Sequence, residues 1–369
     1  MKTRIASLAL LATSVVALTA YSASANDAAL QSARPMFGVI PANAPWHTPP
    51  KHKPVGQLSQ WNGSFTDHHN VKRSFVMVGP DPSTNNATTT IPLEVVPMVM
   101  TYTAFGSMKF NAKKDKYSNG DTVLNNFLNS PLLKSNVDFQ SGGQDMGTTQ
   151  YIDAYQRANF WQANVQTNTN YHVVLGSPTV LKPLKITVAA GQGVVETNPF
   201  GTQKIGTYGF GAMDQKINSY ISTHSAITPD TFVIFVSHNI FLTSGGCCIG
   251  GYHSARSGAP GGQTYGYTTL VTETGSFSQD VSAASHEIGE WMDDPFTTNH
   301  VGCNDNSILE NGDPLVSLPN YGGYHYTANG FQYNLQDLVN LAYFGSPDVS
   351  VNNLHDFQNA RPGTVCPGQ

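Results

Sequence analysis

The chain has 369 residues, of which 40% are apolar and 10% aromatic, enough for one large or two ordinary globular domains. Charged residues make up only 12%, and the formal net charge is -5. A mildly acidic chain without a basic block is a poor candidate for binding nucleic acid, and this apolar content excludes intrinsic disorder. The 34 Gly and 22 Pro predict many turns and exclude a long helical bundle or a coiled coil.

The first 25 residues predict a secretory signal peptide. Lys2 and Arg4 form a basic start, residues 5–20 are apolar or small, and Ala23-Ser24-Ala25 has the pattern of a cleavage site. A membrane anchor is the alternative, but the apolar stretch is short and no stop-transfer flank follows it. We therefore expect a secreted or periplasmic protein, cleaved near Ala25, whose mature chain has no membrane span.

The rest of the chain divides into three predicted parts. Residues 26–60 are Pro-rich and predict an extended arm, residues 61–210 predict a β-rich N-terminal region, and residues 211–369 carry the candidate metal site. Apolar and β-branched runs predict strands at 74–78, 91–102, 171–175, 180–188 and 231–236. Helical spacing of apolar residues predicts helices at 122–133, 151–161, 213–221, 278–292 and 335–344.

Four cysteines, Cys247, Cys248, Cys303 and Cys366, make disulfides possible in an exported protein. Cysteines that form a disulfide usually have Cα atoms about 5.5 Å apart, so neighbours in sequence rarely bond to each other. We expect Cys247 and Cys248 to pair with Cys303 and Cys366, in either order. A zinc site built from cysteines is disfavoured because there is no C-x-x-C spacing.

The segment SQDVSAASHEIGEWMDDP, residues 278–295, predicts an amphipathic helix. Ser278 is its expected N-cap, Asp280 favours the N-terminal end, and Asp294-Pro295 ends it. Opposite an apolar stripe, His286, Glu290 and Asp293 have the spacing i, i+4 and i+7 and so share one face.

This helix contains H-E-x-x-E, a variant of the H-E-x-x-H metal motif. In that motif the two His residues bind a metal one turn apart and the Glu between them is a general base. Glu290 replaces the second His, which preserves the spacing and favours harder metal ions. Only six Glu occur in the chain, so a chance match is expected about 0.003 times. The alternative is a solvated helix face with an incidental His–Glu pair.

A third ligand has to come from another segment. Glu310 lies in the sequence LENGDP and would complete a His286–Glu290–Glu310 site, with Asp313 placed to accept the second N–H of His286. Asn-Gly-Asp-Pro is also strong turn chemistry, and the two interpretations are compatible. His253, in CCIGGYHSA, is the competing third ligand or a group that polarises the substrate.

SAASHEIGEWMDDP resembles the active-site helix of zincin-type metallopeptidases, with a downstream Glu as in gluzincins. The closer resemblance is to the phosphate-induced protein 1 (Exordium-like) family and related secreted bacterial proteins. It rests on Cys248 to Ser254, on His286 to Glu290 with Asp294-Pro295, and on Glu310 to Asp313. This resemblance covers about residues 230–315 and implies a zincin-like fold and peptidase ancestry.

The leading hypothesis is an exported metal-dependent hydrolase, most simply a metallopeptidase acting on a peptide or protein. His286, Glu290 and Glu310 would hold a divalent metal, zinc or another such ion, with Glu287 and His253 as catalytic residues and Asp293 and Asp313 supporting the ligands. The alternative is a non-catalytic extracellular protein that binds cell-wall carbohydrate. A glycosidase with paired carboxylates ranks last, because acids on adjacent turns of one helix are poorly placed to flank a sugar.

For the fold, we expect α+β: a zincin-like, twisted, mostly antiparallel sheet with the 278–292 helix packed under it. A C-terminal lobe tied by disulfides would complete the molecule.

Overall fold

A computed structural model describes residues 33–47, 55–302, 308–347 and 349–366. The predicted signal peptide and its cleavage site lie outside the described residues, and so does Cys303.

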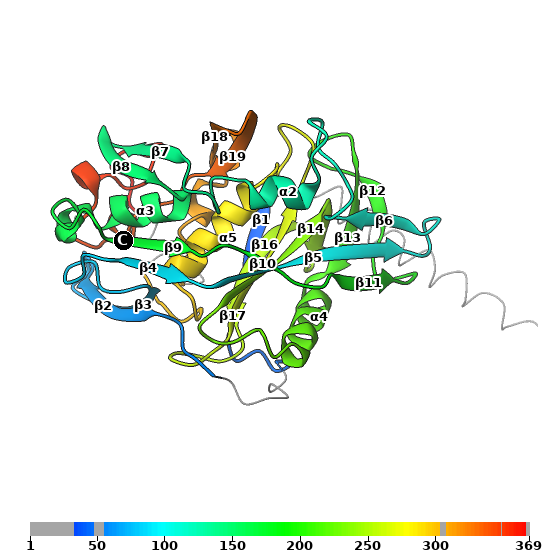
Figure 1. Ribbon diagram of the computed structural model, residues 1–369, viewed down its shortest axis with the longest axis horizontal. Helices are drawn as coiled ribbons and strands as arrows, with labels where there is room; N and C mark the ends of the chain where they lie inside the picture. Colours follow the sequence, from blue (N-terminus) through cyan, green and yellow to red (C-terminus); the bar gives the residue numbers. More distant parts are fainter. Residues whose placement is uncertain (1–32, 48–54, 303–307, 348, 367–369) are drawn as a thin grey trace, which may run out of the picture.

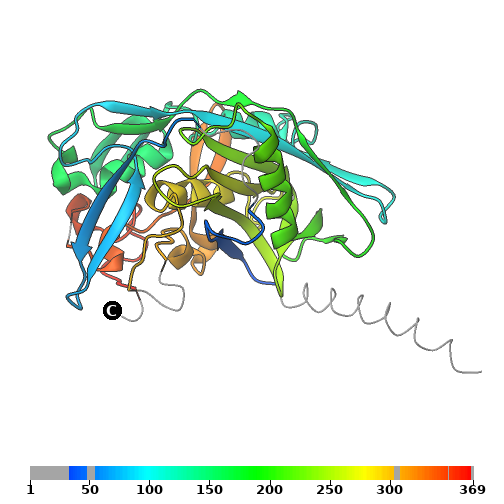
Figure 2. The ribbon, with the colours of Figure 1, turned by 90° about the horizontal axis from the view of Figure 1, so that it is seen from below.

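One mixed sheet of eleven strands dominates the described part of the chain (Figures 1 and 2). Its strands are β1 (Met36–Ile40), β5 (Leu93–Tyr102), β6 (Met108–Asn111), β10 (Thr179–Val180), β11 (Leu184–Val188), β12 (Val195–Thr197), β13 (Lys204–Gly209), β14 (Phe232–His238), β15 (Ile240–Thr243), β16 (Cys247–Ala255) and β17 (Thr264–Leu270). The order β10-β5-β14-β17-β16-β15-β13-β12 forms the path of the sheet, with β1 on β16 and both β6 and β11 on β5. Strands from both sides of residue 210 therefore belong to the same sheet.

The zincin-like α+β prediction is wrong. The sheet curls into a half-barrel, and strands predominate over helices. The expected antiparallel pairing is wrong for its centre, where β14 is parallel to both β5 and β17. The run of apolar residues in β14 is typical of a parallel strand with both faces covered.

Alternate residues of β14 enter two different cores. Phe232, Ile234 and Val236 pack in the core that also contains apolar residues of α3 (Tyr151–Asn159) and α5 (Ser282–Asp293). Val233 and Phe235 pack in the core that contains residues of α4 (Phe210–Thr223). Figure 2 shows α4 and α5 on opposite sides of the strands. Because the side chains of a strand alternate between faces, a sheet covered on both sides buries every residue of β14.

Four two-stranded sheets and several short helices surround this body. The pairs are β2 (Gln60–Thr66) with β3 (Lys72–Val78), β4 (Thr88–Ile91) with β9 (His172–Leu175), β7 (Val137–Ser141) with β8 (Gln144–Thr149), and β18 (Gly323–Ala328) with β19 (Phe331–Gln336). The short helical segments are α2 (Val123–Leu128), the π-helical turn Trp161–Val165, and the 3-10 turns Asp313–Leu315, Pro319–Gly322, Leu341–Phe344 and Val351–Asn353.

Predictions of individual helices were more accurate than the prediction of the sheet topology. The helices predicted at 151–161, 213–221 and 278–292 are confirmed, and the helix predicted at 122–133 is shorter. The predicted late helix at 335–344 is wrong: β19 ends at Gln336, and only a 3-10 turn follows. Ser278 does not cap α5, which begins at Ser282. Ser278 and Asp280 both have positive φ in the loop that leads into this helix.

The cysteine pairing expected for Cys247 and Cys248 is also wrong. Their sulfurs are bonded to each other, with Cα atoms 3.1 Å apart, well under the usual separation. Both residues lie in β16 and are buried beside Phe241 and Phe277. Cys366 is disulfide-bonded as well. The Cys247–Cys248 bond joins neighbours in one strand, so it does not tie a C-terminal lobe to the body.

Candidate metal centre

Helix α5 is buried on every side. Its apolar residues pack in the main core, where the Trp291 ring stacks on Phe232 with centroids 4.0 Å apart and its Nε1–H donates to Thr264 Oγ1 at 3.0 Å. His286, Glu287 and Glu290, on the rest of its surface, have no exposed area. The interpretation of these polar residues as a solvated face is therefore wrong. The helix carries a buried imidazole and two buried carboxylates toward the sheet.

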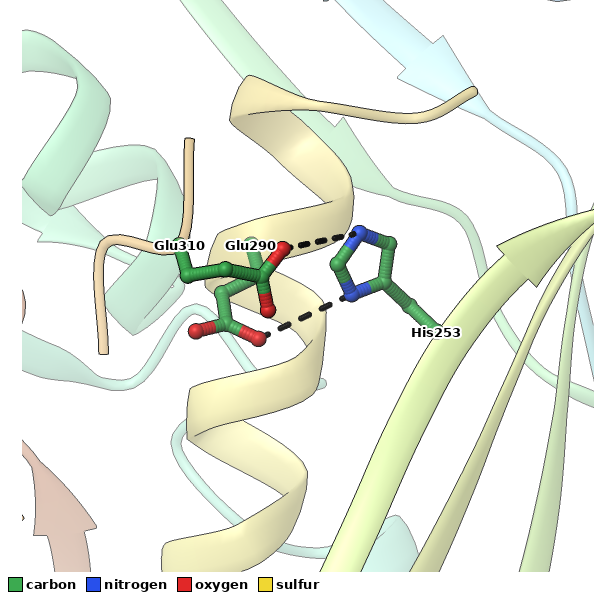
Figure 3. A group of neighbouring side chains, drawn as sticks. All are labelled: His253, Glu290 and Glu310. Carbon is green, nitrogen blue, oxygen red and sulfur yellow. Dashed lines mark ion pairs between the residues drawn. The ribbon is translucent and has the colours of Figure 1, made fainter. Parts of the chain in front are cut away.

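His253 meets these carboxylates from β16, the strand under the helix. Its Nδ1 lies 3.6 Å from Glu287 Oε2 and 3.6 Å from Glu290 Oε2, and its Nε2 lies 4.0 Å from Glu310 Oε1. Figure 3 shows His253 pointing from the strand toward Glu290 on the helix and Glu310 on a third segment. Three parts of the sequence thus converge on one imidazole.

We call His253, His286, Glu287, Glu290, Glu310 and Asp313 the cluster. The segment from Glu310 to Asp313 lies on its open side. The Glu310 side chain is 10% exposed and the Asp313 side chain 45% exposed, whereas His253 and His286 have no exposed side-chain area. Asp313 Oδ1 lies 3.7 Å from His286 Nε2. Solvent therefore reaches the cluster at Asp313.

Potential ligand atoms form two overlapping groups, each with its atoms within 4.8 Å of one another. The first contains His253, Glu290 and Glu310, and the second contains His286, Glu290 and Asp313. The predicted ligands His286, Glu290 and Glu310 all belong to the cluster, but they are divided between the groups. Glu290 is common to both.

Gln336 holds the His286 ring, a role that the sequence suggested for Asp313. Gln336 Nε2–H donates to the carbonyl oxygen of Gly312 at 3.0 Å, which leaves its Oε1 to face His286 Nδ1 at 2.9 Å. Since an amide oxygen only accepts, Nδ1 carries the hydrogen and Nε2 of a neutral ring carries the lone pair. That lone pair is directed toward Glu290 and Asp313. No sequence motif marks Gln336, which lies 50 residues from His286.

Two glycines let the surrounding chain approach the helix. A Cβ at Gly251 of β16 would lie 2.6 Å from Glu287 Cγ, and a Cβ at Gly312 would overlap His286 Nδ1. Any larger residue would have to displace a side chain of the cluster. Steric contact with the cluster, rather than a positive φ, requires glycine at these two positions.

Asp293 supports the cluster from behind. It accepts hydrogen bonds from Tyr155 Oη at 2.9 Å, from Asn311 Nδ2 at 3.0 Å and from Gln156 Nε2. Asn311 immediately follows Glu310, so Asp293 holds in place the segment that presents this carboxylate. It bonds to neither imidazole among the described hydrogen bonds.

The N-terminal arm covers one side of the site. Strand β1 adds in parallel to β16, and the Phe37 ring stacks on the His286 ring with centroids 3.6 Å apart and an interplanar angle of 20°. Residues 26–60 were predicted as an extended arm, and Met36–Ile40 of this arm is a strand of the sheet.

Seven buried polar atoms in this cluster lack a hydrogen-bond partner among the described residues. They are His253 Nδ1 and Nε2, His286 Nε2, Glu287 Oε1 and Oε2, Glu290 Oε2 and Glu310 Oε1. An unsatisfied buried polar group costs about 1–3 kcal/mol, and more if it is charged. A cation among these atoms would satisfy several of them at once, since each carboxylate oxygen and one nitrogen of each neutral imidazole can offer a lone pair.

Raised pKa values of the glutamates show that the buried cluster disfavours negative charge that no cation balances. Burial raises the pKa of Glu290 to about 8. Burial and the neighbouring carboxylates raise the pKa of Glu287 and of Glu310 well above the usual range. Burial also lowers the pKa of His286 to about 4, which leaves its ring neutral. A divalent cation would reverse this preference and hold the carboxylates in their charged forms.

No known protein-family model matches the chain, and neither a curated protein nor a solved structure is detectably similar to it. The resemblance of residues 230–315 to metallopeptidases and to the Exordium-like family therefore stays a prediction. In the part of the chain that the structure describes, no helix is long and apolar enough to cross a membrane.

Proposed function

We propose that this chain is an exported metal-dependent hydrolase. The observation that carries the proposal is the convergence of His253, Glu290 and Glu310, whose buried polar atoms include four without a partner among the described residues. One imidazole and two carboxylates form a ligand set that zinc accepts and that also suits harder divalent ions. Export rests on the predicted signal peptide, and a peptide or protein substrate rests on the H-E-x-x-E helix.

Glu287 is the proposed general base. Both of its carboxylate oxygens lack a hydrogen-bond partner among the described residues, and Oε2 lies 3.6 Å from His253 Nδ1, beside the ligand atoms. A divalent ion, when bound, polarises a water molecule and a substrate carbonyl. Glu287 accepts the proton that this water loses and passes it to the leaving group.

The proposed route for substrate is the segment Glu310–Asp313. Asp313, the most exposed acidic side chain of the cluster, marks where solvent enters. Phe37 covers another side by stacking on His286.

The test combines metal analysis with peptide cleavage. The purified mature protein should bind divalent metal and cleave members of a peptide library. Glu287→Gln should retain the metal and lose turnover by a factor of at least about 100, the scale of general-base catalysis. Glu196→Gln, the same change outside the cluster, should behave as wild type. Normal turnover by Glu287→Gln would refute the mechanism, and a wild-type protein without metal would refute the site.

The second candidate is an extracellular binding protein in which the metal only stabilises the fold. The complete burial of His253, Glu287 and Glu290 favours it, because a catalytic ligand set usually keeps an open position for substrate. The proposed partner is cell-wall carbohydrate. Metal retained without cleavage of any peptide, together with binding to isolated cell-wall polysaccharide, would support this candidate over the hydrolase.

A further inference from the structure

Glu290 lies between two imidazoles and presents a different oxygen to each. Its Oε1 lies 2.8 Å from His286 Nε2, and its Oε2 lies 3.6 Å from His253 Nδ1. The backbone N–H of Gly312 donates to Oε1 at 3.2 Å, which fixes the carboxylate in this orientation. A carboxylate held in this way can bind one cation through each oxygen.

The His286 side of Glu290 has its own acceptors. His286 Nε2 is fully buried and has no hydrogen-bond partner among the described residues, although Glu290 Oε1 and Asp313 Oδ1 lie 2.8 and 3.7 Å away. Because Nδ1–H of His286 donates its hydrogen bond to Gln336 Oε1, the lone pair of a neutral His286 ring is on Nε2 and points at these oxygens. Lone pairs facing each other at this distance repel unless a proton or a metal cation lies between them.

The charge of the cluster favours more than one ion. Glu287, Glu290, Glu310 and Asp313 together carry four negative charges when ionised, and no described Lys or Arg forms an ion pair with any of them. One divalent ion would balance only two of these charges. Two divalent ions would neutralise all four, which is the condition under which buried carboxylates can stay ionised.

We propose that this site holds two divalent metal ions bridged by the carboxylate of Glu290. One ion is bound by His253 and Glu310, and the other by His286 and Asp313. The inference rests on the proposed metal site and deepens it. In two-ion hydrolases the metals lie about 3.5–4 Å apart and stabilise both the attacking and the leaving group.

The experiment counts metal ions on the full mature chain. The protein is stripped with a chelator, dialysed to equilibrium against increasing Mn²⁺, and analysed for bound metal and by electron paramagnetic resonance. Wild type should bind about two equivalents and show the signal of a magnetically coupled pair. Asp313→Asn should bind about one equivalent and show an isolated ion, since its side chain is one ligand of a single ion. Asp138→Asn, an exposed carboxylate in β7, is the matched control and should bind two.

Each outcome bears on the proposal. Two ions in wild type and one in Asp313→Asn would support it, as would the coupled signal, which depends on no variant. Saturation of wild type at one equivalent would overturn it and leave a one-ion hydrolase intact. Asp313→Asn that keeps two coupled ions would overturn the assignment of the second ligand set. Two coupled ions without hydrolysis of any peptide would support the two-ion site while refuting the proposed function.

Discussion

The stability of the metal-free protein should fall as the pH rises from about 6.5 to about 8. The pKa of Glu290 is about 8 in the folded protein and 4.5 in an unfolded chain. Between these values the unfolded chain has released the proton and the folded protein still holds it, so folding becomes less favourable as the pH rises. Each such group contributes about 1.4 kcal/mol per pH unit, which gives about 2 kcal/mol from Glu290 over this range.

The range from pH 6.5 to 8 is chosen so that protonation of His286 contributes little to the change in stability. The pKa of His286 is lowered to about 4 from 6.5 in an unfolded chain, so this group works in the opposite direction, and most of its effect lies below pH 6.5. Burial raises the pKa of Asp280 to about 8 and that of Asp294 to about 7, so both add to the fall in wild type. Because Glu290 also raises the pKa of Glu287 and of Glu310, the difference between wild type and Glu290→Gln reports the contribution of Glu290 together with its effect on these two neighbours.

Urea unfolding of the chelator-treated protein at several pH values gives the free energy of unfolding directly. Relative to its own value at pH 6.5, Glu290→Gln should lose about 2 kcal/mol less than wild type by pH 8. Glu196→Gln should keep the wild-type slope. Added metal should stabilise wild type more at pH 8 than at pH 6.5, because the ligands bind it in their deprotonated forms. Equal slopes for wild type and Glu290→Gln, or stability that rises with pH in this window, would refute the reasoning.

Two further predictions concern the residues that hold His286. Gly312→Ala places a methyl group against His286 Nδ1 and should weaken metal binding at least about tenfold by titration calorimetry. Gly261→Ala, where a Cβ meets nothing within 4 Å, should not, and equal affinities for the two variants would contradict the steric argument. Gln336→Leu removes the acceptor of the Nδ1 hydrogen and should lower metal affinity about 10–100-fold, whereas unchanged affinity would show that the ring needs no such partner.

Sequence patterns predicted the elements whose signals are local. The TFVIFV run predicted β14, and the apolar stripe from Val281 to Met292 predicted α5, because each pattern has the period of its element. The topology of the sheet was not predictable in this way. Strand β5 pairs with β14 across more than 130 residues, and nothing in either strand alone specifies a parallel partner. Gly and Pro content indicates turns, but it does not decide which strands these turns connect.

The residues of the candidate site also fall into those that a local pattern identified and those that only the fold brings together. H-E-x-x-E identified His286, Glu287 and Glu290 because helical geometry relates residues one turn apart. His253 and Glu310 were identified from their chemical type, and only the fold shows that both face Glu290. Gln336, which orients His286, lies 50 residues away in the sequence, and glutamine is too common a residue to mark a site. The bond between Cys247 and Cys248 was missed because the usual Cα separation was taken as a requirement.

The segment that follows Glu310 links metal binding to access. Asn311 Nδ2 bonds to Asp293, the N–H of Gly312 bonds to Glu290, and the carbonyl oxygen of Gly312 accepts from Gln336. The segment Glu310 to Asp313 therefore supplies two candidate ligands, Glu310 and Asp313. It also orients two others, Glu290 directly and His286 through Gln336. Asp313, at the end of this segment, is the most exposed residue of the cluster. A substrate that displaced this segment would release two candidate ligands, Glu310 and Asp313, so under the proposed function the whole segment should stay in place when a substrate binds.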